Sequence, residues 1–277
     1  MEVRYSPDPV AYRTMTQEQL RAAYLIETLF TPDTIPMVYS DIDRSITGSA
    51  VPVQRKLQLH ASKKELAAEY FTERREIGVI NIGGAGIIKA DGKEFHLEGK
   101  DGLYIGRGTK EILFSSDDQS NPAEFYFVSY PAHTAYPTTL IRFSETECSP
   151  LGSQKEANKR TIHRYIHLRG VKSCQLVMGM TELEEGSVWN TMPPHTHVRR
   201  SEIYMYHNLP HNAMVVHLMG KPEETKHIVV RNKQAVLSPS WSIHAGGGTQ
   251  AYSFIWGMGG ENQVFEDMDA VAMDEIK

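Results

Sequence analysis

The amino-acid sequence predicts an all-β protein made of two related β-barrel or jelly-roll domains with a short N-terminal helix. From Met37 onward, short segments rich in β-branched residues alternate with turns that contain glycine, asparagine or aspartate. Two motifs in the first half have counterparts in the second half, which indicates a duplication. The chain of 277 residues has room for one large or two small domains.

The N-terminal helix is predicted from a capping signal. Residues Thr16 to Gln19 form a capping box, in which a threonine and the glutamine three residues later satisfy free backbone N–H groups. Apolar residues that follow, beginning with Leu20, form one face. We therefore expect a helix from Gln17 to about Phe30 that packs against a domain.

We assign this helix and the first series of strands to an N-terminal domain, residues 1–140. The sequence Ala90-Asp91-Gly92-Lys93 lies between two alternating segments and is a strong signal for a tight hairpin. A polar stretch with Pro150 and Gly152 then predicts a connector at residues 141–161. Strand patterns resume in the C-terminal domain, residues 162–277, which ends in an acidic arm.

Composition excludes several classes of protein. A net charge of −5 and a pI near 6.2 give no general attraction to nucleic acid or to an anionic membrane. No apolar run approaches the roughly 18 residues that a membrane span requires, and the charged, proline-containing start is unlike a secretory signal. The two cysteines, Cys148 and Cys174, suggest a reducing compartment, so we expect a cytoplasmic protein.

A candidate metal site lies in the stretch from Trp189 to Tyr206. His195 and His197 are two residues apart, so on a strand both imidazoles project from the same face. Glu202 follows five residues later, and His244 occurs downstream in the sequence PSWSIH. Histidine and carboxylate ligands together suit a divalent transition metal such as zinc or iron. We predict that these four residues bind one metal ion per chain.

These motifs resemble those of the cupin superfamily, in which one strand pair carries H-x-H-x(3,4)-E and a later P-x-G-x-x-H supplies the last histidine. The first motif is intact here. The second has Trp241 at the position where cupins usually carry glycine. The resemblance implies a bicupin fold.

The first half has weaker versions of the same motifs. Residues 74–77, RREI, resemble residues 199–203, RRSEI, and residues 106–111 resemble residues 239–244. If Glu76 corresponds to Glu202, then Glu69, Phe71 and Glu111 take the places of the three histidines. A site without imidazoles cannot bind the metal in the same way, so the N-terminal domain is predicted to be metal-free.

Longer segments narrow the resemblance to one family, the 4-deoxy-L-threo-5-hexosulose-uronate ketol-isomerases. They extend over most of the chain: VYSDIDR, ERREIGVINIGGAG, WNTMPPHTHVRRSE, SPSWSIHAGGGT and FIWGMGGENQVFEDMD. The resemblance implies a hexameric, zinc-containing enzyme of pectin and uronate degradation. Such an intramolecular oxidoreductase converts 4-deoxy-L-threo-5-hexosulose uronate to 3-deoxy-D-glycero-2,5-hexodiulosonate. The family's zinc ligands fall on His195, His197, Glu202 and His244.

An isomerase of this kind requires a general base near the reacting carbon and a group that binds the substrate carboxylate. Four residues are candidates for the base: Glu202, Tyr204, Tyr206 and Glu182. Arg199 and Arg200 adjoin the metal motif and are candidates for the carboxylate, because an arginine fork matches its geometry. Two alternatives remain open from the sequence, an iron cupin dioxygenase and a non-catalytic sugar-binding bicupin.

Overall fold

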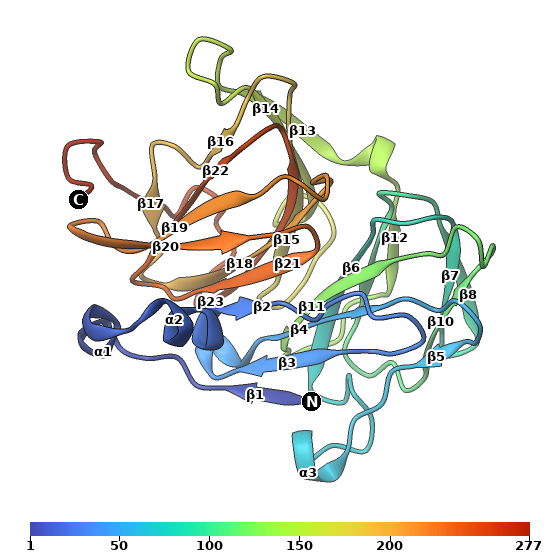
Figure 1. Ribbon diagram of the computed structural model, residues 1–277. Coiled ribbons are helices and arrows are strands. Elements are labelled where there is room, and N and C mark those ends of the chain that lie inside the picture. Colours follow the sequence, from blue (N-terminus) through green and yellow to red (C-terminus); the bar gives the residue numbers. More distant parts are fainter. The chain divides into compact units, whose positions relative to one another are not determined.

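Antiparallel strands are the main regular element of the computed structural model, which describes residues 1–277 (Figure 1). The strands form two units, each with one seven-stranded and one four-stranded sheet. The first unit contains residues 1–3, 28–146 and 165–177, and the second contains residues 4–27, 147–164 and 178–277. This arrangement confirms the predicted all-β fold.

The first unit surrounds an apolar core to which strands of both its sheets contribute. Its seven-stranded sheet has the order β1 (Glu2–Arg4), β3 (Met37–Ser40), β4 (Ile46–Ala50), β11 (Phe125–Pro131), β6 (Arg75–Asn81), β9 (Gly102–Ile105) and β12 (Thr139–Ile141). Its four-stranded sheet has the order β5 (Leu57–Gln58), β10 (Ile112–Ser116), β7 (Gly86–Ala90) and β8 (Lys93–Leu97). Three short helices connect strands of this unit: η1 (Ile42–Arg44), α3 (Lys63–Leu66) and η2 (Phe143–Glu145).

The second unit repeats this plan. Its seven-stranded sheet has the order β13 (Glu147–Leu151), β14 (Arg160–Ile166), β15 (Val177–Leu183), β23 (Ser253–Gly260), β18 (Arg200–His207), β21 (Gln234–Ser238) and β2 (Leu25–Ile26). Its four-stranded sheet has the order β16 (Trp189–Asn190), β22 (Ile243–Gly248), β19 (Val215–Lys221) and β20 (Glu224–Val230). A separate pair joins β17 (His195–Thr196) to β24 (Asp269–Ala270).

The predicted hairpin is present between β7 and β8, where Ala90 pairs with Lys93. Asp91 and Gly92 both have positive φ, at 45° and 84°. A two-residue turn with this twist continues the natural twist of the two strands, and aspartate and glycine are the residues that tolerate it best.

The predicted capping box is also present. Thr16 accepts a hydrogen bond from the backbone of Gln19, whose side chain in turn accepts one from the backbone of Thr16. The helix α2 (Gln17–Tyr24) is shorter than predicted, however. It ends because Leu25 and Ile26 turn into β2 and pair with β21, so tertiary pairing overrides the helical pattern.

Residues 4–27 of the N-terminal lead lie in the second unit and not in the first, to which the sequence analysis assigned them. The helices α1 (Pro9–Thr14) and α2, in blue, lie beside the orange strands β19 and β20 (Figure 1). The predicted connector is also more regular than expected, because β13 occupies residues 147–151 and pairs with β14. The first difference arises from contacts between segments far apart in the sequence, which local patterns do not encode, and the second from a hairpin between neighbouring strands.

No helix in residues 1–277 has the length and apolar character needed to cross a membrane.

Tyr12 anchors the lead to the second unit, which gives a test of the assignment. Its side chain is 1% exposed, its hydroxyl donates to the carbonyl of Met219 at 2.8 Å, and its ring meets Trp241 edge-on. Replacing Tyr12 by alanine should lower the free energy of unfolding of this unit by about 3–5 kcal/mol, the usual effect of truncating a buried aromatic ring. Tyr12→Phe should cost about 1 kcal/mol, because it removes one hydrogen bond.

The measurement is urea denaturation followed by tryptophan fluorescence. It reports on this unit specifically, because all three tryptophans of the chain lie within it: Trp189, Trp241 and Trp256. Tyr5→Ala is the matched control, since Tyr5 is 76% exposed and should leave the midpoint unchanged. Equal midpoints for Tyr12→Ala and Tyr5→Ala would contradict this role of Tyr12.

Candidate metal centre

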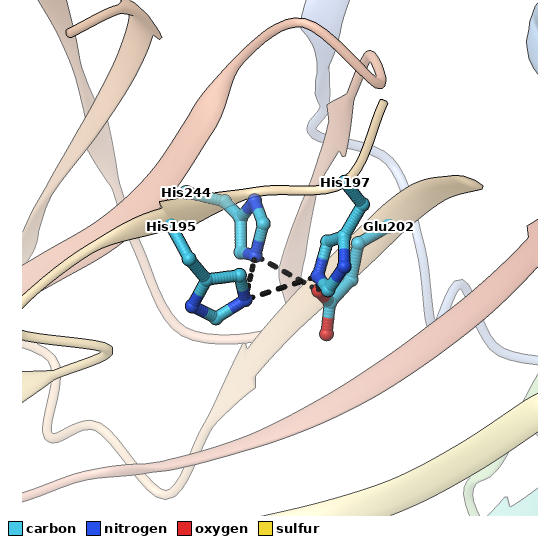
Figure 2. Close-up of side chains that lie close together, drawn as sticks. All are labelled: His195, His197, Glu202 and His244. Carbon is cyan, nitrogen blue, oxygen red and sulfur yellow. Dashed lines mark hydrogen bonds and ion pairs between the residues drawn. The ribbon is translucent and has the colours of Figure 1, made fainter. Parts of the chain in front are cut away.

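Four side chains of the second unit point toward one another (Figure 2). His195 lies on β17, His197 follows it closely, Glu202 lies on the central strand β18, and His244 lies on β22 of the other sheet. The sequence therefore identified four residues that the structure does bring together. Their donor atoms all lie within 4.8 Å of one another.

The distances inside this cluster are short. The Nε2 atom of His195 lies 3.0 Å from the Nε2 atoms of both His197 and His244. The Nε2 atoms of His197 and His244 each lie 2.9 Å from Oε2 of Glu202. Two imidazole nitrogens thus contact one carboxylate oxygen, and the third, that of His195, contacts those two nitrogens.

Backbone carbonyls contact two of the imidazoles at Nδ1, the ring nitrogen that does not face the cluster. The Nδ1 atom of His197 lies 2.9 Å from the carbonyl of Asp267, and Nδ1 of His244 lies 3.4 Å from the carbonyl of Ser242. A carbonyl can only accept, so these contacts are hydrogen bonds when Nδ1 carries the hydrogen of the neutral ring; Arg200, which can only donate, also lies 3.1 Å from Nδ1 of His197 through its Nη2 atom. The Nε2 lone pair is then directed into the cluster, as in other metal-binding histidines.

Burial opposes protonation of His195. Desolvation, helped by the nearby rings of His244 and His197, lowers the pKa of His195 to about 2. Desolvation alone would raise the pKa of Glu202, but His244 and His197 outweigh it and hold that pKa below the usual range of a glutamate. The cluster thus combines imidazole nitrogens with a carboxylate that stays ionised, and imidazole and carboxylate are the donor types that bind such an ion.

This donor set fits a divalent transition metal. Neutral nitrogens that face one another at 3.0 Å repel through their lone pairs unless a proton or a cation lies between them. Imidazole and carboxylate are common ligands of zinc, and imidazole also suits iron, nickel and copper. No other group of three or more histidine, cysteine or acidic side chains converges in this way in residues 1–277.

The corresponding place in the first unit is built differently. Glu76 on β6 is fully buried and accepts hydrogen bonds from the backbone N–H groups of Cys174, Gln175 and Leu176 and from the hydroxyl of Tyr104. Of the residues aligned with the histidines, Glu69 and Glu111 are exposed, and Phe71 packs against Phe127 in the core. The carboxylate is fully occupied by hydrogen-bond donors of the protein.

A cavity of about 190 Å³ lies against the metal cluster, within the second unit. Most of its wall is apolar, and several polar side chains interrupt it. The lining residues are Leu151, Arg160, Ile162, Thr181, Thr191, Pro193, His195, His197, Glu202, Tyr204, Phe254, Trp256, Met258, Phe265 and Met268. A small polar molecule that enters this cavity meets the cluster directly.

Two of the four candidate bases line this cavity, Glu202 and Tyr204. The hydroxyl of Tyr204 lies 2.9 Å from Oγ1 of Thr191, and burial raises its pKa well above the usual value, so it stays protonated near neutral pH.

The other two candidate bases do not line the cavity. Tyr206 is fully buried, with its hydroxyl 2.7 Å from Nδ1 of His217. Glu182 pairs with His163 at 3.4 Å. Its neighbour Thr181 lines the cavity, and because successive strand residues face opposite ways, Glu182 faces away from the cavity.

Arg199 and Arg200, the predicted carboxylate-binding residues, do not line the cavity. The exposed guanidinium of Arg199 pairs with Asp267 and Asp269 of the C-terminal arm. The buried guanidinium of Arg200 donates to the backbone carbonyls of Val264 and Asp267, each at 2.7 Å. Both arginines therefore hold the arm in place beside His197.

Sequence reasoning missed Arg160 and the part played by the arm. Arg160 lies at the start of β14 and faces the cavity together with Ile162, two residues further on. Phe265 and Met268 of the arm also line the cavity, because β24 pairs with β17 and His195 lies opposite Ala270. The alternation of Arg160 and Ile162 was visible in the sequence, but nothing local indicated which face was inside.

Comparison with known proteins gives the family. The model of the KduI/IolB family matches residues 31–275, nearly the whole chain. The chain belongs to this family. It is 57% identical over 277 residues to a protein of Caldicellulosiruptor bescii and 56% identical to one of Lachnoclostridium phytofermentans, with full coverage of all three chains. Both relatives are named 4-deoxy-L-threo-5-hexosulose-uronate ketol-isomerase.

A solved structure shares the fold at much lower sequence identity. An IolB-like protein of Salmonella typhimurium has a TM-score of 0.73 and 15% identity, and the match covers 90% of this chain and 96% of that one. At this identity the likeness supports the fold of the KduI/IolB family and carries no conclusion about activity.

The ligand set can be tested by metal content. Wild-type protein loaded with a divalent transition metal and then desalted should retain one ion per chain. His244→Ala should lower the metal affinity by at least about a hundredfold, since losing a direct ligand costs more than losing a hydrogen bond behind one, which costs 10–100-fold. Elemental analysis after equilibrium dialysis measures both quantities.

His211→Ala is the matched control, because His211 is exposed and lies outside the cluster. Two ions per chain in the wild type, or unchanged affinity in His244→Ala, would be incompatible with the proposed ligand set.

Proposed function

We propose that this chain is a metal-assisted aldose–ketose isomerase that acts on 4-deoxy-L-threo-5-hexosulose uronate and forms 3-deoxy-D-glycero-2,5-hexodiulosonate. The main support is the combination of 56–57% identity over the full length to two ketol-isomerases with a convergent His/Glu cluster that opens into a cavity. This reaction moves a hydrogen between an alcohol carbon and the neighbouring aldehyde carbon. It therefore needs groups that hold both oxygens and a group that carries the proton.

His195, His197, Glu202 and His244 would hold the metal, and zinc is the ion that we propose. Zinc accepts histidine and carboxylate ligands and has no redox chemistry of its own, which suits a reaction with no net oxidation. When bound, such an ion supplies Lewis acidity that polarises the substrate carbonyl and stabilises the negative charge that develops on its oxygen.

The chain's own residues supply the proton transfers. Glu202 borders the cavity and its Oε2 atom faces His197 and His244, so we assign its other oxygen, Oε1, as the base that removes the proton from the alcohol carbon and returns it to the aldehyde carbon. The hydroxyl proton of the alcohol passes to the aldehyde oxygen in the same conversion, so that atoms and charge balance. Tyr204 stays protonated and is held by Thr191, so its hydroxyl donates a hydrogen bond to a substrate oxygen. The apolar walls, among them Phe254 and Met258, exclude water and strengthen these polar contacts.

Turnover tests the proposal directly. The purified protein is incubated with the unsaturated uronate released by a pectin lyase, and NMR follows the loss of the aldehyde and the appearance of the ketose. His244→Ala should lower kcat by at least about a hundredfold, the scale on which a charge-stabilising group acts. Its circular dichroism should remain that of the wild type, since two β-sheet units with apolar cores do not need a metal to fold.

Two results would count against the isomerase. Oxygen consumption without ketose would make the chain a dioxygenase, and binding of the uronate without any turnover would make it a sugar-binding protein. Normal kcat in a His244→Ala protein that has lost its metal would assign the ion a structural role.

We also propose that the chain assembles as a homohexamer in which residues 1–140 form most of the subunit contacts. The first unit contains no cluster comparable to the metal centre, and subunit contacts would give it a role in the enzyme. Closed symmetric assembly is the common form of a soluble oligomer. Cys148 and Cys174 form no disulfide, which suits a reducing compartment, and we propose the cytoplasm.

Sedimentation equilibrium at micromolar concentration measures the assembly. We expect a mass about six times that of the 31.3 kDa chain. A monomer at this concentration would contradict the hexamer and leave the metal site unaffected.

A further inference from the structure

Arg160 is the only arginine or lysine among the residues that line the cavity. The substrate of the proposed reaction is a sugar acid, whose carboxylate needs a cationic partner in a largely apolar site. The other cations near the metal motif, Arg199 and Arg200, already bind acidic side chains or carbonyls of the C-terminal arm.

The guanidinium of Arg160 is largely unsatisfied. Its Nη1 atom donates to the backbone carbonyl of Asn158 at 2.7 Å, and no carboxylate forms an ion pair with it. Burial lowers the pKa of Arg160, since its charge is partly withdrawn from water without a counter-ion. Guanidinium has five N–H donors, so most of its hydrogen-bonding capacity faces no acceptor of the protein. An anion in the cavity would supply both the missing charge and the missing acceptors.

The spacing of the strands suits a six-carbon substrate. Arg160 lies on β14 and Glu202 on β18, three strands further along the same sheet. At about 4.8 Å per strand, their backbones lie roughly 14 Å apart along the sheet. Both side chains line the same cavity, and an extended six-carbon chain covers roughly 6 Å between its end carbons. One end of the substrate can therefore lie at the metal cluster while the other end meets Arg160.

We propose that Arg160 binds the carboxylate of the substrate through a paired hydrogen-bonded contact, and that it thereby selects sugar acids over neutral sugars. This inference rests on the proposed isomerase function. A planar guanidinium matches both oxygens of a carboxylate, and a neutral sugar would leave the half-buried cation without a counter-ion. Because the carboxylate is remote from the reacting carbons, the contact has the same strength in the ground state and in the transition state.

The test compares Arg160→Ala, Arg160→Lys and a matched control, Lys159→Ala. Lys159 precedes Arg160 in the chain, pairs with Glu184 and does not line the cavity. For Arg160→Ala we expect KM to rise about a hundredfold and kcat to stay within a few-fold, the pattern for loss of uniform binding. Arg160→Lys should recover part of the loss, and Lys159→Ala should match the wild type.

Two further readouts separate a binding role from a structural one. Millimolar guanidinium ion should lower the KM of Arg160→Ala and leave that of Lys159→Ala unchanged, because the free ion can occupy the vacated place. Metal content should remain one ion per chain in all variants. An unchanged KM in Arg160→Ala, or a loss of kcat without a change in KM, would overturn the proposal.

Calorimetry keeps this inference distinct from the proposed reaction. Titration of the ketose sugar acid and of its neutral alcohol analogue into the protein measures binding without turnover. We expect the acid to bind the wild type at least about a hundredfold more tightly than the neutral analogue, and this preference should vanish in Arg160→Ala. If the wild type shows this preference but does not isomerise the uronate, the reaction is wrong and the role of Arg160 stands. Equal preference in wild type and Arg160→Ala contradicts that role, whatever the turnover.

Discussion

The second unit depends on one constraint, the convergence of three imidazole nitrogens and one carboxylate in a single buried cluster. Taking polar groups out of water costs roughly 1–3 kcal/mol each unless they find partners. Here the partners are one another, at 2.9–3.0 Å, and the arrangement repels itself until a cation or proton lies between the nitrogens. The two sheets and the β17–β24 pair must therefore hold the four side chains in place, which makes the site preorganised for a metal.

The first unit shows the other solution to burying a glutamate at this position. Glu76 and Glu202 lie on strands that occupy equivalent places in the two seven-stranded sheets. Around Glu76 the partners are three backbone N–H groups and the hydroxyl of Tyr104, all of them donors. Around Glu202 they are imidazoles, whose nitrogens can act as ligands. The same strand order thus supports a saturated carboxylate in one unit and a candidate metal centre in the other.

Local signals in the sequence predicted the features that depend on neighbouring residues. The HxH spacing, the glutamate five residues later, the capping box at Thr16 and the Asp91-Gly92 turn all act within a few residues. Features that depend on distant pairing were missed. Helix α2 ends early because Leu25 and Ile26 pair with β21, and the C-terminal arm reaches the cavity because β24 pairs with β17. Arg199 and Arg200 lie near the metal motif in sequence, yet they bind acidic side chains and carbonyls of the arm. Arg160 lies far from the motif in sequence and lines the cavity.

The central claim is that this one cluster holds the ion on which turnover depends. Its most direct test is a titration of chelator-treated protein with zinc, in which the rate of isomerisation of the uronate is measured at each addition. The account predicts negligible turnover without metal and a linear rise that ends at one equivalent per chain. Full turnover by the metal-free protein, or a rise that continues to two equivalents, would contradict it.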